Sequence, residues 1–280
     1  MIKMLLSKNY IESQVCIALE EDLGKLGDIT SQATVPQNQK SSAKIKINQD
    51  AVLCGIDFAC LAFKLLDKKI KISARKKDGS YLKKGSTILK LHGNTQAILA
   101  AERTALNFLG LMSGIATKAK NYSKIAKKYG SEIYSTRKTI VGIRDLQKYA
   151  LNIGGANINR MTLDDFFFIK DNHISQSKDI TKTIAQVKAC YPKKKITIEV
   201  DTITQLKKII NEKIDVVLLD NMNAMQIKKC IKIINGRFQC EASGNITLKN
   251  LNTISKTGVN RISTGQLTHS ISNVDFGLEI

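Results

Sequence analysis

The chain has 280 residues, of which 43% are hydrophobic and 24% charged, an ordinary balance for a globular protein with a large core. Its formal net charge of +20 would suit nucleic acid, an anionic membrane surface or small polyanionic substrates. No stretch of sequence approaches the length of a bilayer span, and the apolar run at residues 4–6 is too short for a secretory core. We therefore expect a cytoplasmic protein that does not associate with membranes.

Cysteine and arginine usage indicates which kinds of ligand the protein can bind. The six cysteines form no C-x-x-C pair and no cluster with histidine, so we expect reduced thiols instead of a zinc site or disulfides. Arginine is scarce, and four of the seven arginines lie between residues 103 and 160. Because guanidinium binds carboxylate and phosphate through two parallel hydrogen bonds, this clustering predicts a dedicated anion site.

The N-terminal part of the chain predicts a small α/β domain. Apolar residues at helical spacing predict an amphipathic helix over residues 9–23. Residues 42–93 alternate apolar and polar positions between turn signals, which predicts an antiparallel sheet with a helix near residues 56–66. Residues 95–117 predict one long helix, in which the charged residue Arg103 marks an interface or a site.

Strand and helix alternate along the rest of the chain. Short β-like runs, mostly separated by helical segments, occur at residues 132–136, 166–170, 195–200, 215–220, 238–243 and 261–264. Alternation at this spacing predicts a parallel sheet that curves into an α/β barrel.

Nearly every predicted strand ends on side chains suited to binding anions or metal. In barrels of this type the carboxyl ends of the strands converge on one mouth, where the active site lies. We therefore expect the following residues to meet at one cavity: Thr136, Arg137, Lys138, Lys170, Asp171, Asn172, His173, Glu199, Asp220, Glu241, Ser243, Gly244, Ser263, Thr264 and Gly265.

The basic residues Arg137, Lys138, Arg160 and Lys170 would surround that cavity. Because like charges repel strongly where water is excluded, such a group requires a ligand with at least two negative charges. The alternative is that all four are surface residues paired with nearby aspartates.

The acidic and small residues at the strand ends complement these cations. Glu199 and Asp220 end consecutive strands, and two carboxylates beside a phosphorylated substrate predict a Mg²⁺ site. They could instead stabilise positive charge on a sugar or merely cap the strands. The turns Ser243-Gly244-Asn245 and Ser263-Thr264-Gly265 each precede a predicted helix, where small residues let backbone N–H groups approach a phosphate.

Two other classes of function fit parts of this pattern. A barrel lyase or aldolase would use Lys138 or Lys170 to form a Schiff base, but the surrounding arginines and paired acids favour a phosphorylated substrate. Nucleic-acid binding would use the excess positive charge, but the aromatic residues are too few and too scattered to form a stacking platform. We expect no nucleic-acid partner.

Six segments together resemble the quinolinate phosphoribosyltransferase family, and they occur in the family's order across nearly the whole chain. They are EDLGKLGDIT (21–30), AERTALNFLGLMSGIAT (101–117), STRKT (135–139), IKDNH (169–173), EASGNI (241–246) and STGQLTHS (263–270). The resemblance implies a type II phosphoribosyltransferase, in which an N-terminal α/β sandwich packs against an incomplete α/β barrel. We place the sandwich at residues 1–105 and the barrel at residues 106–266, and we expect the tail at 267–280 to pack on the sandwich.

The resemblance also implies roles for individual residues. The pyridine dicarboxylate would be held by Arg137, Lys138, Arg160 and Lys170. Thr136 and Asn159 would also bind substrate. Glu199 and Asp220 would serve the ribose and Mg²⁺ of phosphoribosyl pyrophosphate, and would act in catalysis with Lys138. The turns Ser243-Gly244-Asn245 and Ser263-Thr264-Gly265 would hold the 5′-phosphate. Arg103 would reach the pocket of a second subunit in a homodimer, which could form part of a higher oligomer.

The implied reaction is displacement of pyrophosphate from the ribose by the pyridine nitrogen, followed by decarboxylation of the cationic ring to give nicotinate mononucleotide for NAD biosynthesis. Three positions depart from the family pattern. Asn159 stands where the family usually has histidine, Ala156 interrupts a glycine run, and Val141 replaces a proline. Because asparagine cannot supply a positive charge, a related enzyme with another ring acceptor, such as nicotinate, remains the alternative.

Overall fold

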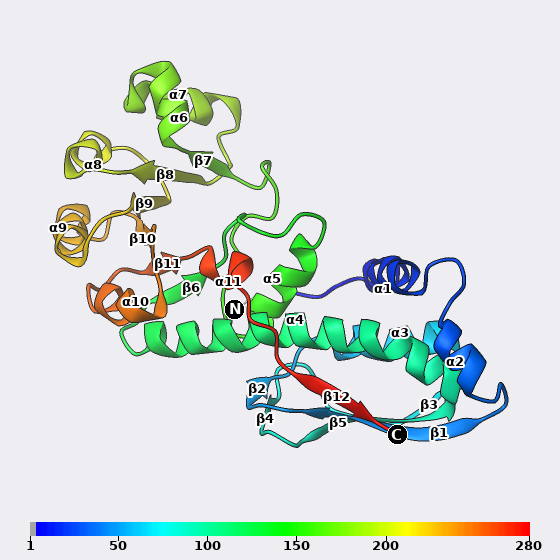
Figure 1. Cartoon of the computed structure of the whole chain (residues 1–280). Coiled ribbons are helices and arrows are strands. Elements are labelled where there is room, and N and C mark those ends of the chain that lie inside the picture. Colours follow the sequence, from blue (N-terminus) through cyan, green and yellow to red (C-terminus); the bar gives the residue numbers. More distant parts are fainter. Residues whose placement is uncertain (1–3) are drawn as a thin grey trace. The chain divides into compact units, whose positions relative to one another are not determined.

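The computed structural model describes residues 4–280 and divides into two compact units (Figure 1). The second unit consists of Asn121–Ile140 and Gly155–His269, and the rest of the chain forms the first unit. This division differs from the expected boundaries, because residues 106–120 and 141–154 belong to the first unit. The helix α5 (Arg144–Ile153) is held there by hydrogen bonds from the Tyr149 hydroxyl to Asp78 (2.9 Å) and from the Leu146 N–H to the Tyr10 hydroxyl (3.3 Å).

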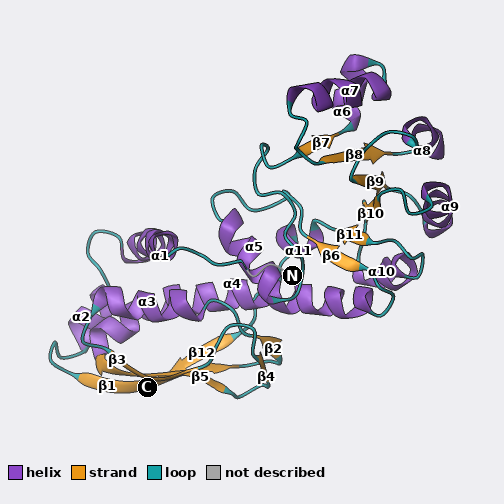
Figure 2. Ribbon diagram, turned by 180° about the vertical axis from the view of Figure 1, so that it is seen from behind, coloured by secondary structure: helices purple, strands orange, loops and turns teal. Residues whose placement is uncertain are grey.

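The first unit is an antiparallel sheet covered by helices, as Figure 2 shows. Its four main strands lie in the order β12-β1-β5-β3, so the last strand of the chain pairs with the first. Strand β1 buries Ala43, Ile45 and Ile47, while the lysines between them stay nearer solvent. Besides α5, the elements of this unit are α1 (Lys8–Leu23), α2 (Ile29–Thr34), β1 (Lys40–Ile47), β2 (Ala51–Val52), α3 (Ile56–Leu66), β3 (Lys71–Arg75), β4 (Tyr81–Leu82), β5 (Thr87–Asn94), most of α4 (Thr95–Lys127), and β12 (Phe276–Glu279).

The second unit is an open parallel sheet of six strands in the order β6-β11-β10-β9-β8-β7, so the predicted incomplete α/β barrel is confirmed. Helices α7 to α10 lie along one side of this sheet (Figure 1). Its elements are β6 (Glu132–Tyr134), β7 (Phe167–Ile169), α6 (Asp171–Ser177), α7 (Ile180–Cys190), β8 (Ile196–Val200), α8 (Ile203–Ile209), β9 (Val216–Asp220), α9 (Ala224–Ile234), β10 (Gln239–Ser243), α10 (Leu248–Ser255), β11 (Arg261–Ser263) and α11 (Gln266–His269).

The strand register determines which side chains share the inner face of this sheet. Glu199 of β8 is level with Leu218 of β9, and Leu218 is level with Glu241 of β10. One step nearer the carboxyl ends, Asp220 is level with Ser243. Because side chains two residues apart on a strand share a face, Glu199, Asp220, Glu241 and Ser243 all point inward, whereas Val217 and Leu219 are buried on the other face.

Two expectations drawn from composition can be compared with this structure. All six cysteines are free thiols, as predicted. Among residues 4–280, no helix combines the length and the apolar character that a membrane span requires.

Candidate active site

A cavity of about 490 Å³ opens at the carboxyl ends of the parallel strands, and all of its lining residues belong to the second unit. Of the site residues predicted from the sequence, those that line it are Thr136, Arg137, Lys138, Asn159, Arg160, Lys170, Glu199, Asp220, Glu241, Ser243, Gly244, Asn245, Ser263, Thr264 and Gly265. Arg103 does not line it within the described chain, and instead lies exposed on the part of α4 that belongs to the first unit. Residues far apart in sequence therefore meet at one opening, as the strand-end pattern predicts.

The basic side chains of the cavity are placed by the aromatic strand β7 and by the loop after β6. The Arg160 guanidinium lies 5.0 Å from the ring centre of Phe168, and the Lys170 ammonium lies 4.9 Å from the same ring. Burial lowers the pKa of Arg160, and the neighbouring Arg137 lowers it further. Arg137 Nε is buried and has no hydrogen-bond partner among residues 4–280. Clustered, partly desolvated guanidinium groups favour a ligand that carries more than one negative charge.

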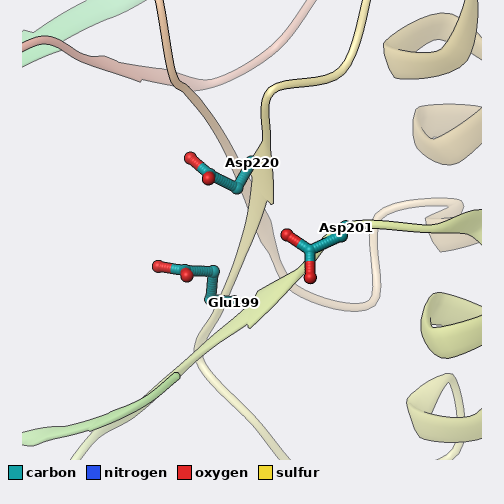
Figure 3. Close-up of side chains that lie close together, drawn as sticks. All are labelled: Glu199, Asp201 and Asp220. Atoms are coloured by element: carbon teal, nitrogen blue, oxygen red, sulfur yellow. The ribbon is translucent and has the colours of Figure 1, made fainter. Parts of the chain in front are cut away.

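Three carboxylates gather at the ends of β8 and β9. Glu199, Asp201 and Asp220 each place an oxygen within 4.8 Å of the others, and Figure 3 shows Glu199 and Asp220 extending in the same direction from neighbouring strands. The Lys170 ammonium lies 2.7 Å from Glu199 Oε2. Burial raises the pKa of Asp201, and the charge of Asp220 raises it further, so the acids interact with one another. Such a group can take a divalent cation or stabilise positive charge on a ligand.

The two turns that follow β10 and β11 are tied together at the rim of the cavity. Gly244 has φ +86°, a left-handed conformation that suits glycine. The Thr264 hydroxyl donates a hydrogen bond of 2.8 Å to the Ile246 carbonyl, which joins the second turn to the first. The Thr268 hydroxyl donates to the Lys138 carbonyl at 2.5 Å, which joins α11 to the loop that carries the cations.

Two residues of the site, Asp201 and His269, were not predicted from the sequence. Asp201 stands two residues after Glu199, and the two-residue period of a strand could have indicated that both carboxylates face the same way. His269 lines the cavity, although no pattern in the sequence pairs it with another site residue. Glu241 lines the cavity as expected from its strand, whereas Asp171, Asn172 and His173 do not line it. Glu241 is fully buried, and Arg261 Nε lies 2.9 Å from its Oε2. No sequence signal connects Glu241 to Arg261, because their contact depends on the order of the strands.

Comparisons with known proteins agree with this fold. Residues 28–113 match the N-terminal domain of quinolinate phosphoribosyl transferase, and residues 115–279 match its C-terminal domain. A mitochondrial quinolinate phosphoribosyltransferase [decarboxylating] of Nicotiana tabacum is 37% identical over 283 residues, covering 94% of this chain and 80% of the relative. A probable nicotinate-nucleotide pyrophosphorylase [carboxylating] of Bacillus subtilis is 36% identical over 261 residues, covering 93% and 90% of the two chains.

A solved structure gives the same result in three dimensions. The nicotinate-nucleotide pyrophosphorylase from Francisella tularensis superposes with a TM-score of 0.94 at 35% identity, covering 98% of this chain and 97% of that one. The domain matches cover almost the whole chain, the relatives are more than 30% identical and the fold is shared. All three findings indicate the same family. The chain belongs to the quinolinate phosphoribosyltransferase family and is a phosphoribosyltransferase.

Proposed function

We propose that the protein catalyses the Mg²⁺-dependent transfer of phosphoribose from phosphoribosyl pyrophosphate to quinolinate, with decarboxylation, in the de novo biosynthesis of NAD. The products would be nicotinate mononucleotide, pyrophosphate and carbon dioxide. One observation carries this proposal: the cations and acids predicted from distant segments line a single cavity. The names of the relatives point to the same reaction.

The chemistry of the lining divides the cavity into two parts. Quinolinate carries two carboxylates, and we assign them to Arg137, Arg160 and Lys170, with Lys138, Thr136 and Asn159 beside them. Glu199 and Asp220 would contact the ribose, and the turns Ser243-Gly244-Asn245 and Ser263-Thr264-Gly265 would bind the 5′-phosphate through backbone N–H groups. The assignment leaves no cation in the cavity without an anionic group to bind.

The acidic cluster fits a Mg²⁺ ion. Oxygens of Glu199, Asp201 and Asp220 lie within 4.8 Å of one another, and Mg²⁺ prefers one or two carboxylates completed by water and phosphate oxygens. Glu199 and Asp220 would hold the ion, which when bound would neutralise charge on the pyrophosphate. The Lys170 ammonium contacts one oxygen of Glu199 and so balances part of the negative charge of this cluster.

The protein's own groups can carry the reaction without a covalent intermediate. The pyridine nitrogen forms a bond to the ribose C1 as the bond from C1 to the pyrophosphate oxygen breaks, so positive charge develops on the sugar. Glu199 and Asp220 would stabilise that charge, and Lys138 would stabilise the departing anion. The bond to the carboxylate beside the ring nitrogen then breaks, and its electron pair stays on the ring carbon, where the neighbouring positive nitrogen stabilises it. That carbon takes up a proton as carbon dioxide leaves.

We also propose that the active form is a homodimer in which Arg103 enters the partner's cavity. Arg103 is an exposed cation on α4 and lines no part of the cavity of its own chain within residues 4–280. A charge on a long, largely apolar helix suits an interface. This assignment would add a cation to the quinolinate pocket.

One residue supports a second candidate acceptor. Asn159 lies on the cavity wall beside Arg160, and its amide contributes no charge for a second carboxylate. Nicotinate, which has one carboxylate, would need fewer cations than quinolinate. In that case replacing Asn159 with histidine should hardly improve turnover of quinolinate.

The decisive assay mixes the protein with Mg²⁺, phosphoribosyl pyrophosphate and either quinolinate or nicotinate, and measures nicotinate mononucleotide and carbon dioxide. We expect product from quinolinate with one carbon dioxide per turnover. K170M should lower kcat/KM by about 100-fold, because it removes a charge that acts in the cavity. K188M is the matched control, because Lys188 pairs with Glu212 at 3.0 Å outside the cavity. Turnover of nicotinate but not of quinolinate would show that nicotinate is the acceptor.

A further inference from the structure

The turn that follows β10 separates two cavities. Ser243, Gly244, Asn245 and Ile246 line the main cavity and also a smaller one of about 310 Å³. Asn221 lines only the smaller cavity, on the opposite side of this turn from the proposed substrates. A residue in that place can influence the reaction only through the groups that it holds.

Asn221 contacts both halves of the proposed phosphoribosyl site. Its side-chain amide donates a hydrogen bond of 2.7 Å to Asp220 Oδ2, and its side-chain carbonyl accepts one of 3.2 Å from the Asn245 amide. Its backbone N–H donates to the Ser243 carbonyl at 3.0 Å. Asn221 therefore connects the carboxylate at the end of β9 to the turn at the end of β10.

Asn221 and Gly244 are also fitted to one another. A Cβ atom at position 244 would lie 2.1 Å from Asn221 Oδ1 and 2.8 Å from the Asn221 backbone nitrogen, so no larger residue fits at Gly244. The far side of the turn is held as well, because the Asn250 amide donates to the Asn245 carbonyl at 3.0 Å. The turn thus keeps one conformation in which Asn221 is one of its supports.

The backbone and the chemistry together restrict which residue can do this. Asn221 has φ +52°, a left-handed conformation that glycine, asparagine and aspartate adopt most readily. Glycine has no side chain, and aspartate cannot donate to the carboxylate of Asp220. Among these residues only asparagine can donate to Asp220 and accept from Asn245 at once.

We propose that Asn221 is a positioning residue. It sets the orientation of Asp220 and that of the turn Ser243-Gly244-Asn245, so that the ribose and the 5′-phosphate of the donor are held in the correct relative position. This inference rests on the proposed phosphoribosyl donor and does not depend on the acceptor. Displacement of a catalytic group by about 1 Å lowers the rate by roughly 100-fold, so a small movement of either support has a measurable effect.

Two variants separate the two hydrogen bonds. N221G tolerates the left-handed backbone and removes both bonds, so we expect the KM for phosphoribosyl pyrophosphate to rise by about 10-fold or more, with kcat also reduced. N221D retains the acceptor for Asn245 but places a second carboxylate against Asp220. Because like charges repel, N221D should displace Asp220 and raise the KM for phosphoribosyl pyrophosphate. A role in folding alone would lower the amount of active protein and leave that KM unchanged.

Asn235 provides the matched control. It also has a left-handed backbone, with φ +45°, and it caps the other end of α9, outside both cavities. N235G and N235D should leave the KM for phosphoribosyl pyrophosphate unchanged. If N221G binds and turns over phosphoribosyl pyrophosphate like wild type, or if N235G loses as much activity as N221G, the inference is wrong.

A binding measurement distinguishes this inference from the proposed function. Calorimetric titration with ribose 5-phosphate requires no acceptor, and N221G should bind it about 10-fold more weakly than wild type and N235G. Wild type that binds ribose 5-phosphate but does not convert quinolinate would contradict the proposed acceptor and leave the Asn221 comparison valid. Wild type that binds neither ribose 5-phosphate nor phosphoribosyl pyrophosphate would overturn both.

Discussion

Glu241 shows how a single charge can be kept on the inner face of the parallel sheet. Its side chain is fully buried, Arg261 Nε lies 2.9 Å from Oε2, and the Arg261 guanidinium carbon lies 3.8 Å from the ring centre of Tyr134. Burial raises the pKa of Glu241, while Arg261 and a hydrogen bond from Ser263 lower it. The net effect is a raised pKa, so the desolvation of the carboxylate outweighs the attraction of Arg261.

Removing Arg261 should therefore destabilise the protein in a pH-dependent way. R261M leaves a buried carboxylate without its counter-charge, a change that typically costs about 3–5 kcal/mol in the free energy of unfolding. A carboxyl group whose pKa is raised by folding stabilises the native state below its ordinary value of 4.5 and loses that contribution as the pH rises. The loss in R261M should consequently be larger at pH 8 than at pH 5.

Urea unfolding at the two pH values measures this effect. The double variant E241Q/R261M is the control, because a neutral amide has no charge to leave unpaired. It should be more stable than R261M at pH 8 and should show less dependence on pH. Equal stability of R261M at both pH values would mean that the Glu241 carboxylate is not the source of the cost.

At the scale of elements, helix α4 is crossed closely by the segment that leads to β12. A Cβ atom at Gly114 would lie 2.2 Å from the Ser272 carbonyl oxygen, whereas one at Gly110 would lie 3.0 Å from the Val274 oxygen. The Val274 N–H donates to the Gly110 carbonyl at 3.0 Å, which fixes the crossing. The two glycines allow the C-terminal segment to pack against the helix backbone.

Alanine at these positions should therefore have an effect opposite to its usual one. In an unobstructed helix, replacing glycine with alanine stabilises by about 0.5–1 kcal/mol. G114A must displace the Ser272 backbone, and overpacking of this kind costs about 1–3 kcal/mol. Thermal unfolding should rank wild type above G114A, with G110A between them, and amide exchange in β12 should be faster in G114A. A G114A protein more stable than wild type would contradict the crossing.

The elements were predictable where local pattern determines them. All six runs predicted as barrel strands contain strands, because buried parallel strands are short apolar runs between helices. Helix α4 extends to Lys127 instead of residue 117, because Ala119, Tyr122 and Ala126 continue its buried face among lysines. The Glu241–Arg261 contact and the bridging role of Asn221 could not be predicted, since both depend on which strands become neighbours.

At the scale of the whole molecule, the two units contribute different parts of the proposed enzyme. The second unit contains every residue of the described cavity, whereas Arg103 lies in the first unit. If Arg103 serves the partner's cavity, one chain cannot complete its own site. The proposal therefore makes activity a property of the dimer, and it predicts how two defective chains behave together.

R103A and K170M should each be nearly inactive, yet activity should return when the two are co-expressed with different affinity tags. In a mixed dimer, the cavity of the R103A chain keeps its Lys170 and receives Arg103 from the K170M chain, so it is intact. The other cavity carries both changes. Random pairing gives mixed dimers in half of the population, and the expected activity is about one quarter of wild type. Purification through both tags should raise this to about one half.

K124A, which removes another exposed cation of α4, should remain active by itself. Full activity of R103A alone, or inactive mixed dimers, would show that each chain builds its cavity without Arg103 of its partner.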